Sequence, residues 1–533
     1  MALLNLAVSL SNKQLAKYFI VILMLSVIIG SVSLTYPFGR DQGIYAYIAK
    51  LILNGKIDYK YSYNLRPPGT HYVFALGQLL LGESMLGMRI FDILWQSLTG
   101  LVIFQIVILI TGKKNFGLIS AFLYVFLYYR LDYWHTMQTE GFMNLPFTLC
   151  VLLLIKTDAK RMLLKYFLAG MFFTVAAIFK FTIAAFTLLL VILLLIDFKS
   201  ELSERLKKIF SFIAGSLIFV FAVLVYYYIN SALSQLLEIQ FVQIPHYAKI
   251  GYETETSGFI VSNIFRLFFY SVYSPLLFLS FILFVILVYK RKLDMRISIL
   301  FIWLASSLLS LIMQWKFFYY HFLIIVPPAV ICAAYSVQLI RNELKEKYLK
   351  YVNISSAILL LLFILAGSTS YYSRYGELIS YVWGKQSMEE LYIKYGTTSD
   401  SVFTIKKVNE LTDYVKQNTK AGDRIYIWGI EPLIYYLSGR DCVSRFTYNT
   451  PLYWRGDDSR YQKEFIQSIQ KENPKLILVA RRDPMYNITG YKEDSEQMLQ
   501  RFSEFREIID RYYVLKADIE EFKIYQLLTP FSN

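Results

Sequence analysis

Long apolar runs recur through most of this chain, and they constrain its fold more than any other feature. Each run holds about 15 to 25 residues, roughly the length of helix that crosses the hydrocarbon core of a bilayer. Hydrophobic residues make up 56% of the chain, above the apolar share of about half in an ordinary soluble protein. The sequence therefore predicts a polytopic α-helical membrane protein that lies in the lipid bilayer.

The apolar runs predict about eleven transmembrane helices. The first run, from Tyr18 to Leu34, is longer than a signal-peptide core and lacks a small-residue cleavage site, so we expect it to be retained. The predicted spans lie near 18–35, 88–110, 116–129, 141–155, 166–179, 181–196, 209–229, 262–288, 297–314, 322–340 and 352–370.

Basic loops predict the orientation of these spans. Clusters of Lys and Arg alternate along the chain, near 113–114, 156–165, 199–208, 290–296 and 341–350. The positive-inside rule places these clusters and the N-terminus in the cytoplasm and the C-terminus outside. Because basic loops flank 166–196, this segment is predicted to be a hairpin with its tip near Lys180. The net charge of +15 is mostly explained by these loops, so it does not imply a nucleic-acid partner.

Two loops and the C-terminal part are predicted to lie outside the membrane. Loops 37–87 and 230–261 interrupt a membrane domain of residues 1–370, and both are longer than a connection requires. Residues 371–533 are charged and free of spanning runs, which predicts a soluble extracytoplasmic α/β domain. We expect strands at 424–429, 475–479, 512–515 and 522–527, and helices at 405–418, 431–437, 459–472 and 494–510.

The first external loop is predicted to begin with a short helix over residues 41–55. Apolar residues recur at three-to-four spacing from Ile44 to Ile52, which favours a helix lying on the membrane surface. Asp41 would stand at the N-cap of this helix. A carboxylate here could take a proton from an acceptor hydroxyl or amine, or it could simply cap the helix and pair with Arg40.

Arg66 is the second candidate in this loop. Pro67 and Pro68 follow it and stiffen the chain, so its guanidinium would be presented to a phosphate rather than left mobile. An interfacial lipid anchor is the alternative.

Two further candidates are ionisable residues at predicted hairpin tips. Glu140 lies at the tip of a hairpin predicted over 116–155, where a carboxylate entering a membrane helix is costly unless it is paired or faces a wet cavity. It could bind a metal or steer the acceptor, or it could simply be solvated at the interface. Lys180 lies inside an apolar run, so its ammonium either faces a cavity that holds an anionic phosphate or snorkels to the surface.

Lys316 and His321 stand at the outer junction of two late spans. His321 could bind a metal ion or polarise a phosphate oxygen, although a histidine among aromatic residues is more often a packing residue. The three cysteines and the other histidines show no metal-ligand spacing.

Taken together, these residues resemble the polyprenyl-phosphate-dependent GT-C glycosyltransferases, which include protein O-mannosyltransferases and aminoarabinose transferases. The resemblance lies in the order of an acid after the first span (Asp41), a helix, a basic residue before two prolines (Arg66) and a run from Gly82 to Arg89 into the second span. The external domain, with Tyr426-Ile-Trp-Gly429, also looks like the C-terminal region of bacterial relatives.

The resemblance implies a role for each candidate. Asp41 would act as base or orient the acceptor, and Glu140 would take the place of the second-loop acid of the family. The cations expected to hold the donor phosphate are Arg40, Arg66, Lys180, Lys316 and His321. Many members carry Asp-Glu where this chain has Asp41-Gln42, so a divalent metal is possible but one of its ligands would be missing.

The predicted activity is transfer of a sugar, with inversion, from a polyprenyl-phosphate donor to an extracytoplasmic glycan, lipid or protein. The expected location is the bacterial cytoplasmic membrane. A transporter or flippase of lipid-linked sugars is the alternative from another class. The candidate residues gather at outer ends of spans rather than at mid-bilayer, which favours the transferase.

Overall fold

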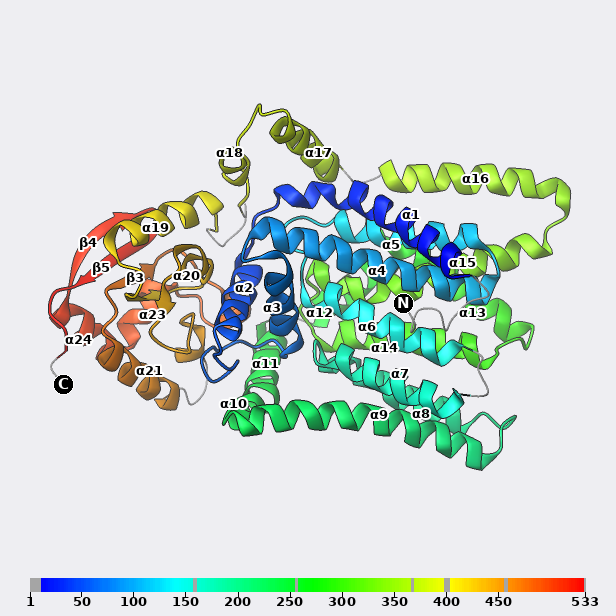
Figure 1. Ribbon diagram of the computed structural model, residues 1–533, viewed down its shortest axis with the longest axis horizontal. Helices are drawn as coiled ribbons and strands as arrows, with labels where there is room; N and C mark the ends of the chain where they lie inside the picture. Colours follow the sequence, from blue (N-terminus) through cyan, green and yellow to red (C-terminus); the bar gives the residue numbers. More distant parts are fainter. Residues whose placement is uncertain are drawn as a thin grey trace. The chain divides into compact units, whose positions relative to one another are not determined.

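The computed structural model describes residues 11–156, 161–254, 257–365, 369–396, 403–454 and 459–531 (Figure 1). The chain forms two compact units. The first, which we call the membrane unit, comprises the chain up to Leu34, Arg89–Val225 and Ser257–Ile379. The second, which we call the sheet unit, comprises Thr35–Met88, Tyr226–Thr256 and Ser380–Asn533. The loop at 37–87 and most of the loop at 230–261 therefore fold together with the C-terminal segment.

The membrane unit is built from apolar helices. Within the described residues, five stretches are long and apolar enough to cross a bilayer: Lys13–Thr35, Met85–Thr111, Leu202–Ile229, Met295–Met313 and Tyr319–Glu343. Its helices are α1 (Asn12–Gly30), α4 (Met85–Thr111), α5 (Lys114–Tyr129), α6 (Thr139–Ile155), α7 (Met162–Ala177), α8 (Ala185–Leu195), α9 (Leu202–Ile229), α12 (Ser257–Phe269), α13 (Ser274–Tyr289), α14 (Met295–Met313), α15 (Val326–Glu343), α16 (Glu346–Leu365) and α17 (Thr369–Val382). Among the described residues, each predicted span lies mostly on helix, and residues 366–368 of the span predicted at 352–370 lie outside them. The number of helices that cross the membrane stays a prediction.

One predicted span is not continuous. The run expected at 262–288 is broken between α12 and α13, which are bent by 79°. The hydroxyls of Ser271 and Ser274 both donate to the carbonyl of Leu267, at 2.7 and 2.9 Å. Side chains that bond to a helix's own carbonyls compete with its backbone bonds, and Pro275 favours a new helix start. Hydropathy alone does not detect such a break.

Two glycines bring α7 and α9 close together. A Cβ on Gly170 would lie 2.0 Å from the carbonyl oxygen of Phe212, and one on Gly215 would lie 1.9 Å from that of Phe167. Small residues let helix backbones approach closely inside a membrane. This contact fixes α7, at whose end the chain breaks at Lys180 before the 3₁₀ turn Phe181–Ala184. The two helices expected on either side of Lys180 are confirmed, whereas the hairpin predicted for them stays a prediction.

The core of the sheet unit is a five-stranded sheet in the order β2-β1-β3-β5-β4. Strand β1 is parallel to β2 and β3, whereas β5 is antiparallel to β3 and β4. The strands are β1 (Arg424–Trp428), β2 (Asp441–Cys442), β3 (Leu476–Ala480), β4 (Tyr513–Ile519) and β5 (Phe522–Leu527). The four predicted strands are confirmed, and the two-residue β2 was not predicted.

Helices surround this sheet. The predicted helices correspond to α19 (Ile405–Asn418), α20 (Leu433–Ser438) and α21 (Ser459–Glu472), while the one expected at 494–510 is divided into α23 (Ser495–Arg501) and α24 (Ser503–Tyr512). The loops and connections of the unit contribute α2 (Arg40–Leu53), α3 (Gly69–Leu81), α10 (Leu233–Glu238), α11 (Ile244–Thr254), α18 (Met388–Tyr392) and α22 (Tyr486–Thr489).

The apolar face of helix α2 is covered by protein, and its predicted place at the membrane surface stays a prediction. It packs against α3 and α20, and its residues Ile44, Tyr47 and Ile48 are buried. A Cβ on Gly43 would lie 2.7 Å from Cβ of Leu433, so α20 approaches the backbone of α2 directly. Periodicity identified the apolar face of α2 correctly, but it does not say whether protein or lipid covers that face.

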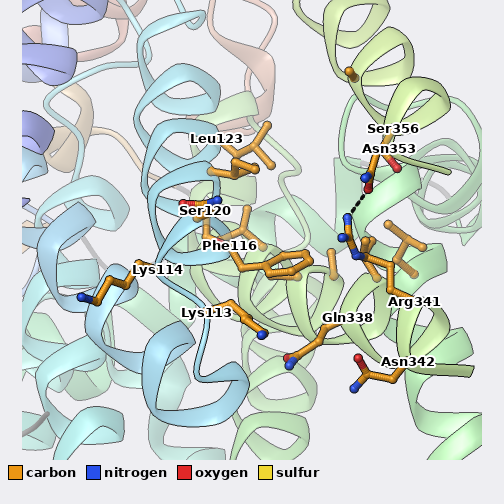
Figure 2. Close-up of a pocket in the computed structure, with 18 of the residues that line it drawn as sticks. Lys113, Lys114, Phe116, Ser120, Leu123, Gln338, Arg341, Asn342, Asn353 and Ser356 are labelled. Carbon is orange, nitrogen blue, oxygen red and sulfur yellow. Dashed lines mark hydrogen bonds between the residues drawn. The ribbon is translucent and has the colours of Figure 1, made fainter. Parts of the chain in front are cut away.

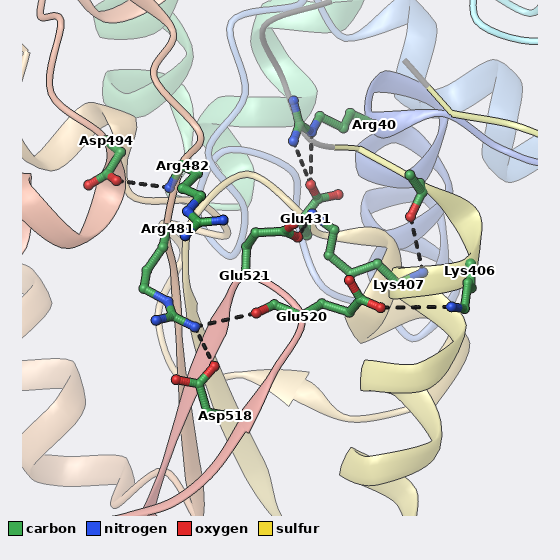
Figure 3. A network of polar contacts seen from close by, with 11 residues as sticks. Arg40, Lys406, Lys407, Glu431, Arg481, Arg482, Asp494, Asp518, Glu520 and Glu521 are labelled. Atoms are coloured by element: carbon green, nitrogen blue, oxygen red, sulfur yellow. Dashed lines mark hydrogen bonds and ion pairs between the residues drawn. The ribbon is translucent and has the colours of Figure 1, made fainter. Parts of the chain in front are cut away.

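Ion pairs tie α2 into the sheet unit (Figure 3). Arg40 Nη2 lies 2.6 Å from Glu431 Oε1, just before α20, and both side chains are buried. On α19, Lys407 Nζ lies 2.6 Å from Glu521 Oε2 in the turn between β4 and β5. Burial raises the pKa of Glu431, and the Arg40 guanidinium acts in the opposite direction. The Arg40–Glu431 pair holds the first turn of α2, which carries Asp41.

Candidate active site

Asp41 and Arg66 come together in the sheet unit. Asp41 Oδ2 lies 3.5 Å from Arg66 Nη2, with side-chain exposures of 29% and 23%. Asp41 comes from the first turn of α2, and Arg66 comes from the segment before α3. The two candidates of the first external loop thus form one partly exposed ion pair.

The predicted N-cap role of Asp41 is wrong. The N-cap of α2 is Gly39, and its backbone N–H donates to the side chain of Gln42 at 3.1 Å. Asp41 lies within the first turn, where a carboxylate is favoured by the helix dipole. Its expected partner Arg40 bonds instead to Glu431. The side chain of Gln42 thus caps α2, and Asp41 pairs with Arg66.

Several hydrogen bonds fix Arg66. Its Nε donates to the hydroxyl of Tyr45 at 2.9 Å, and its backbone N–H donates to Asn64 Oδ1 at 2.8 Å. The hydroxyl of Tyr59 donates to its carbonyl oxygen at 2.7 Å. The chain bends at Leu65 and Arg66. Arg66 is thus held on both its backbone and its side chain.

A buried Asp–His pair supports this segment. Asp58 Oδ2 lies 2.5 Å from His71 Nδ1, and neither side chain is exposed. Asp58 Oδ1 also accepts from the backbone N–H of Tyr59 at 2.8 Å, next to the residue whose hydroxyl holds Arg66. Sequence reasoning missed this pair because the two residues lie 13 positions apart in a loop with no regular spacing.

Two tyrosines lie near enough to Asp41 and Arg66 to be affected by their charges. Burial is the main cause that raises the pKa of Tyr247 to about 12; Arg66 acts against this shift and Asp41 adds to it. Burial also raises the pKa of Tyr448, and the same two charges act on it. Tyr247 lies in the loop at 230–261, so both long loops and the C-terminal segment contribute to this site.

Glu140 and Lys180 form a second site in the membrane unit. The carboxylate of Glu140, in the first turn of α6, is fully buried and contacts the ammonium of Lys180 through Oε1. Lys180 also donates to Oε1 of Gln314, at the C-terminal end of α14. Oε2 of Glu140 is buried and has no hydrogen-bond partner among the described residues. The ammonium of Lys180 bonds to groups inside the protein, so its side chain does not snorkel to the surface.

Lys316 and His321 lie in the segment that follows α14. His321 Nε2 is 3.8 Å from Glu140 Oε1. Lys316 is buried, and its neighbours Trp315 and Phe317 have φ values of 59° and 46°. Non-glycine residues rarely adopt positive φ, and such strain gathers at functional sites. The strained turn brings this segment to Glu140.

Metal ligands do not gather in either site. Within the part of the chain that the structure describes, no group of three or more His, Cys, Asp or Glu side chains could hold a metal ion. The three cysteines are buried and unpaired with one another.

Two comparisons now bear on these sites. Residues 65–228 match the family model described as dolichyl-phosphate-mannose-protein mannosyltransferase. The crystal structure of ArnT from Cupriavidus metallidurans bound to undecaprenyl phosphate is similar over 97% of this chain and 99% of that chain, with 12% identity and a TM-score of 0.55. Its apo structure gives 11% identity, coverage of 96% and 98%, and a TM-score of 0.54. No curated protein matches by sequence.

The chain is a membrane glycosyltransferase with the GT-C fold. The matched family segment begins at Leu65, next to Arg66, and ends within α9, so it contains Glu140 and Lys180. The predicted fold class and enzyme class are confirmed, and nothing supports the flippase alternative. In this glycosyltransferase Asp41 and Arg66 belong to the sheet unit, whereas Glu140, Lys180, Lys316 and His321 belong to the membrane unit.

Proposed function

We propose that the protein transfers a sugar, with inversion, from a polyprenyl-phosphate donor to an extracytoplasmic glycan, lipid or protein. The observation that carries this proposal is the partly exposed Asp41 carboxylate held 3.5 Å from Arg66. A carboxylate that reaches solvent can accept a proton, and a guanidinium beside it can bind a phosphate oxygen. The expected setting is the bacterial cytoplasmic membrane, with the N-terminus in the cytoplasm and the sheet unit outside.

In the reaction, Asp41 removes the proton of the acceptor hydroxyl or amine. The acceptor's electron pair then forms a bond to the anomeric carbon, while the bond from that carbon to the phosphate oxygen breaks. Polyprenyl phosphate leaves with the electron pair, so negative charge grows on its oxygen. Preorganised cations stabilise such charge most in a site that excludes water.

The cations have different roles. Arg66 is partly exposed and fixed by Tyr45, which suits direct binding of the donor phosphate. Lys180 contributes positive charge beside Glu140 within the membrane unit, and the His321 ring lies 3.8 Å from the same carboxylate. Arg40 is buried against Glu431, so we propose that it positions α2 and has no direct contact with phosphate.

The test is sugar transfer by the purified full-length protein in nanodiscs with a radiolabelled polyprenyl-phosphate sugar and candidate acceptors. Wild type should release polyprenyl phosphate and label the acceptor, and Asp41→Asn should do neither. Asp413→Asn, at an exposed carboxylate of α19, is the matched control and should keep full activity. Full transfer by Asp41→Asn would remove Asp41 from the mechanism.

The orientation has its own test. A cysteine introduced as Asp413→Cys should react with a membrane-impermeant thiol reagent in spheroplasts, because the sheet unit is proposed to lie outside. Labelling only after the membrane is opened would place the sheet unit in the cytoplasm and contradict the proposed location of the reaction.

A further inference from the structure

A cavity of about 900 Å³ lies in the membrane unit, away from the residues discussed so far (Figure 2). Its walls come from the start of α5, from α13 and α15, and from α16. Glu140 lies beyond the other end of α5, and a helix of 16 residues is about 24 Å long. The cavity is therefore separate from the Glu140–Lys180 site within the same unit.

The cavity joins apolar walls to positive charge. Leu276 on α13, Val330 on α15 and Ile119 on α5 are among its apolar lining residues. Lys113 and Arg341 also line it, and none of its described lining residues is acidic. Figure 2 shows Lys113, Phe116 and Arg341 toward the interior, whereas Lys114 points the other way. The Nζ of Lys114 lies 5.8 Å from the ring of Tyr18.

Arg341 is oriented by neutral groups. Its guanidinium lies 5.8 Å from the centre of the Phe116 ring and donates to Oδ1 of Asn353. Among the described residues, no ion pair joins Arg341 or Lys113 to a carboxylate. Cations held at an apolar cavity without a carboxylate are complementary to an anion that carries its own apolar chains.

Gln338, which also lines the cavity, has a side-chain oxygen that could accept a hydrogen bond from a ligand. Its Nε2 donates to the carbonyl oxygen of Thr111 at 2.7 Å, which closes the end of α4. Its Oε1 is buried and has no hydrogen-bond partner among the described residues. A buried acceptor without a partner is costly, and the hydroxyl of a ligand headgroup would satisfy it.

We infer that this cavity binds an anionic phospholipid whose headgroup carries a hydroxyl. Lys113 and Arg341 bind the phosphate, Gln338 accepts from the headgroup hydroxyl, and an acyl chain lies along the apolar walls from α13 and α15. Basic pockets between transmembrane helices bind anionic headgroups on the cytoplasmic side. The basic loops that contain Lys113 and Arg341 are the ones predicted to be cytoplasmic.

The test is native mass spectrometry of the full-length protein after delipidation and incubation with phosphatidylglycerol or phosphatidylcholine. Wild type should retain phosphatidylglycerol about tenfold better than phosphatidylcholine, a difference of about 1.4 kcal/mol. Lys113→Ala/Arg341→Ala should remove this preference. Lys292→Ala, at an exposed lysine of another basic loop, should keep it. Equal retention of both lipids by wild type, or an unchanged preference in the double variant, would overturn the inference.

A second variant tests the cavity without changing charge. Ala334→Trp places a large side chain at a lining position of α15 and should displace the lipid. Unchanged lipid binding in this variant would also contradict the inference.

Two competition arms identify the ligand chemistry. Millimolar inorganic phosphate should fail to displace phosphatidylglycerol, because it lacks the acyl chain, and polyprenyl phosphate should displace it less well than a second phospholipid does. Displacement by phosphate, or stronger displacement by polyprenyl phosphate, would overturn the assignment to phospholipid. Sugar transfer is measured on the same variants, so that a failure of lipid binding can be told apart from a failure of the proposed glycosyltransferase activity.

Discussion

The two units contain two carboxylate–cation pairs that differ in exposure. Asp41 and Arg66 in the sheet unit are 3.5 Å apart and roughly one quarter exposed. Glu140 in the membrane unit is fully buried against Lys180. An exposed pair contributes little stability and can exchange partners, whereas removal of one member of a buried pair leaves an uncompensated charge. The comparison predicts that Asp41 serves the reaction and that Glu140 also serves the fold.

The largest expected effect is on turnover. Asp41→Asn should lower kcat by about 10²- to 10⁴-fold, the usual contribution of a general base. Its apparent Tm should remain that of wild type, because the pair it breaks is partly solvated. Steady-state transfer and thermal unfolding of the same preparation check both outcomes. A large drop in Tm would mean that Asp41 is structural and that the two pairs do not differ as described.

Removal of Glu140 should act on stability. Glu140→Ala leaves the Lys180 ammonium buried without its carboxylate and should cost about 3 to 5 kcal/mol. Glu140→Leu/Lys180→Met replaces both charges and should restore most of the stability without restoring transfer. Thermal unfolding in detergent and transfer assays measure the two effects, with Glu346→Ala at an exposed glutamate as control. If Glu140→Ala were as stable as wild type, the Glu140–Lys180 pair would not support the fold.

Arg66 tests the phosphate contact. Arg66→Ala should raise KM for the donor by about 10- to 100-fold, since a hydrogen bond to a charged group contributes about 1.5–3 kcal/mol. Arg66→Lys should recover only part of this loss, because an ammonium cannot bond to both Tyr45 and a phosphate oxygen in the same geometry. Donor titrations provide the measurement. An unchanged KM in Arg66→Ala would assign the donor phosphate to other cations.

The smallest effect concerns pH. Burial raises the pKa of Glu431 above its unfolded value. A raised folded pKa gives stability that is fully present below the unfolded value of about 4.3 and is lost as pH rises through the folded pKa. As pH rises from the unfolded pKa through the folded pKa of Glu431, the apparent Tm of wild type should therefore fall more than that of Glu431→Gln. If the two proteins gave parallel curves of Tm against pH, the Arg40–Glu431 pair would be insensitive to pH.

Sequence patterns predicted those features that depend on local periodicity. Strands β1, β3, β4 and β5 were found because their apolar residues are continuous or alternate, and two separate helices flank Lys180 as expected. The kink between α12 and α13 was missed because it depends on serine hydroxyls rather than on hydropathy.

The candidate site was predictable only in part. Asp41 and Arg66 were found through the prolines and through the order of motifs in the first loop, and the structure brings them together. The Asp58–His71 pair, Tyr247 and Tyr448 were not found, because tertiary packing places them there and no spacing records it. Arg40 has the residue type of a phosphate ligand, yet its buried partner lies 391 positions away in the chain.

The most direct test of the role of Asp41 is a single turnover of enzyme loaded with a polyprenyl-phosphate sugar and then mixed with acceptor. The Asp41→Asn variant should bind the donor with the wild-type Kd but fail to cleave the bond between sugar and phosphate. Cleavage by Asp41→Asn at the wild-type rate would contradict the account.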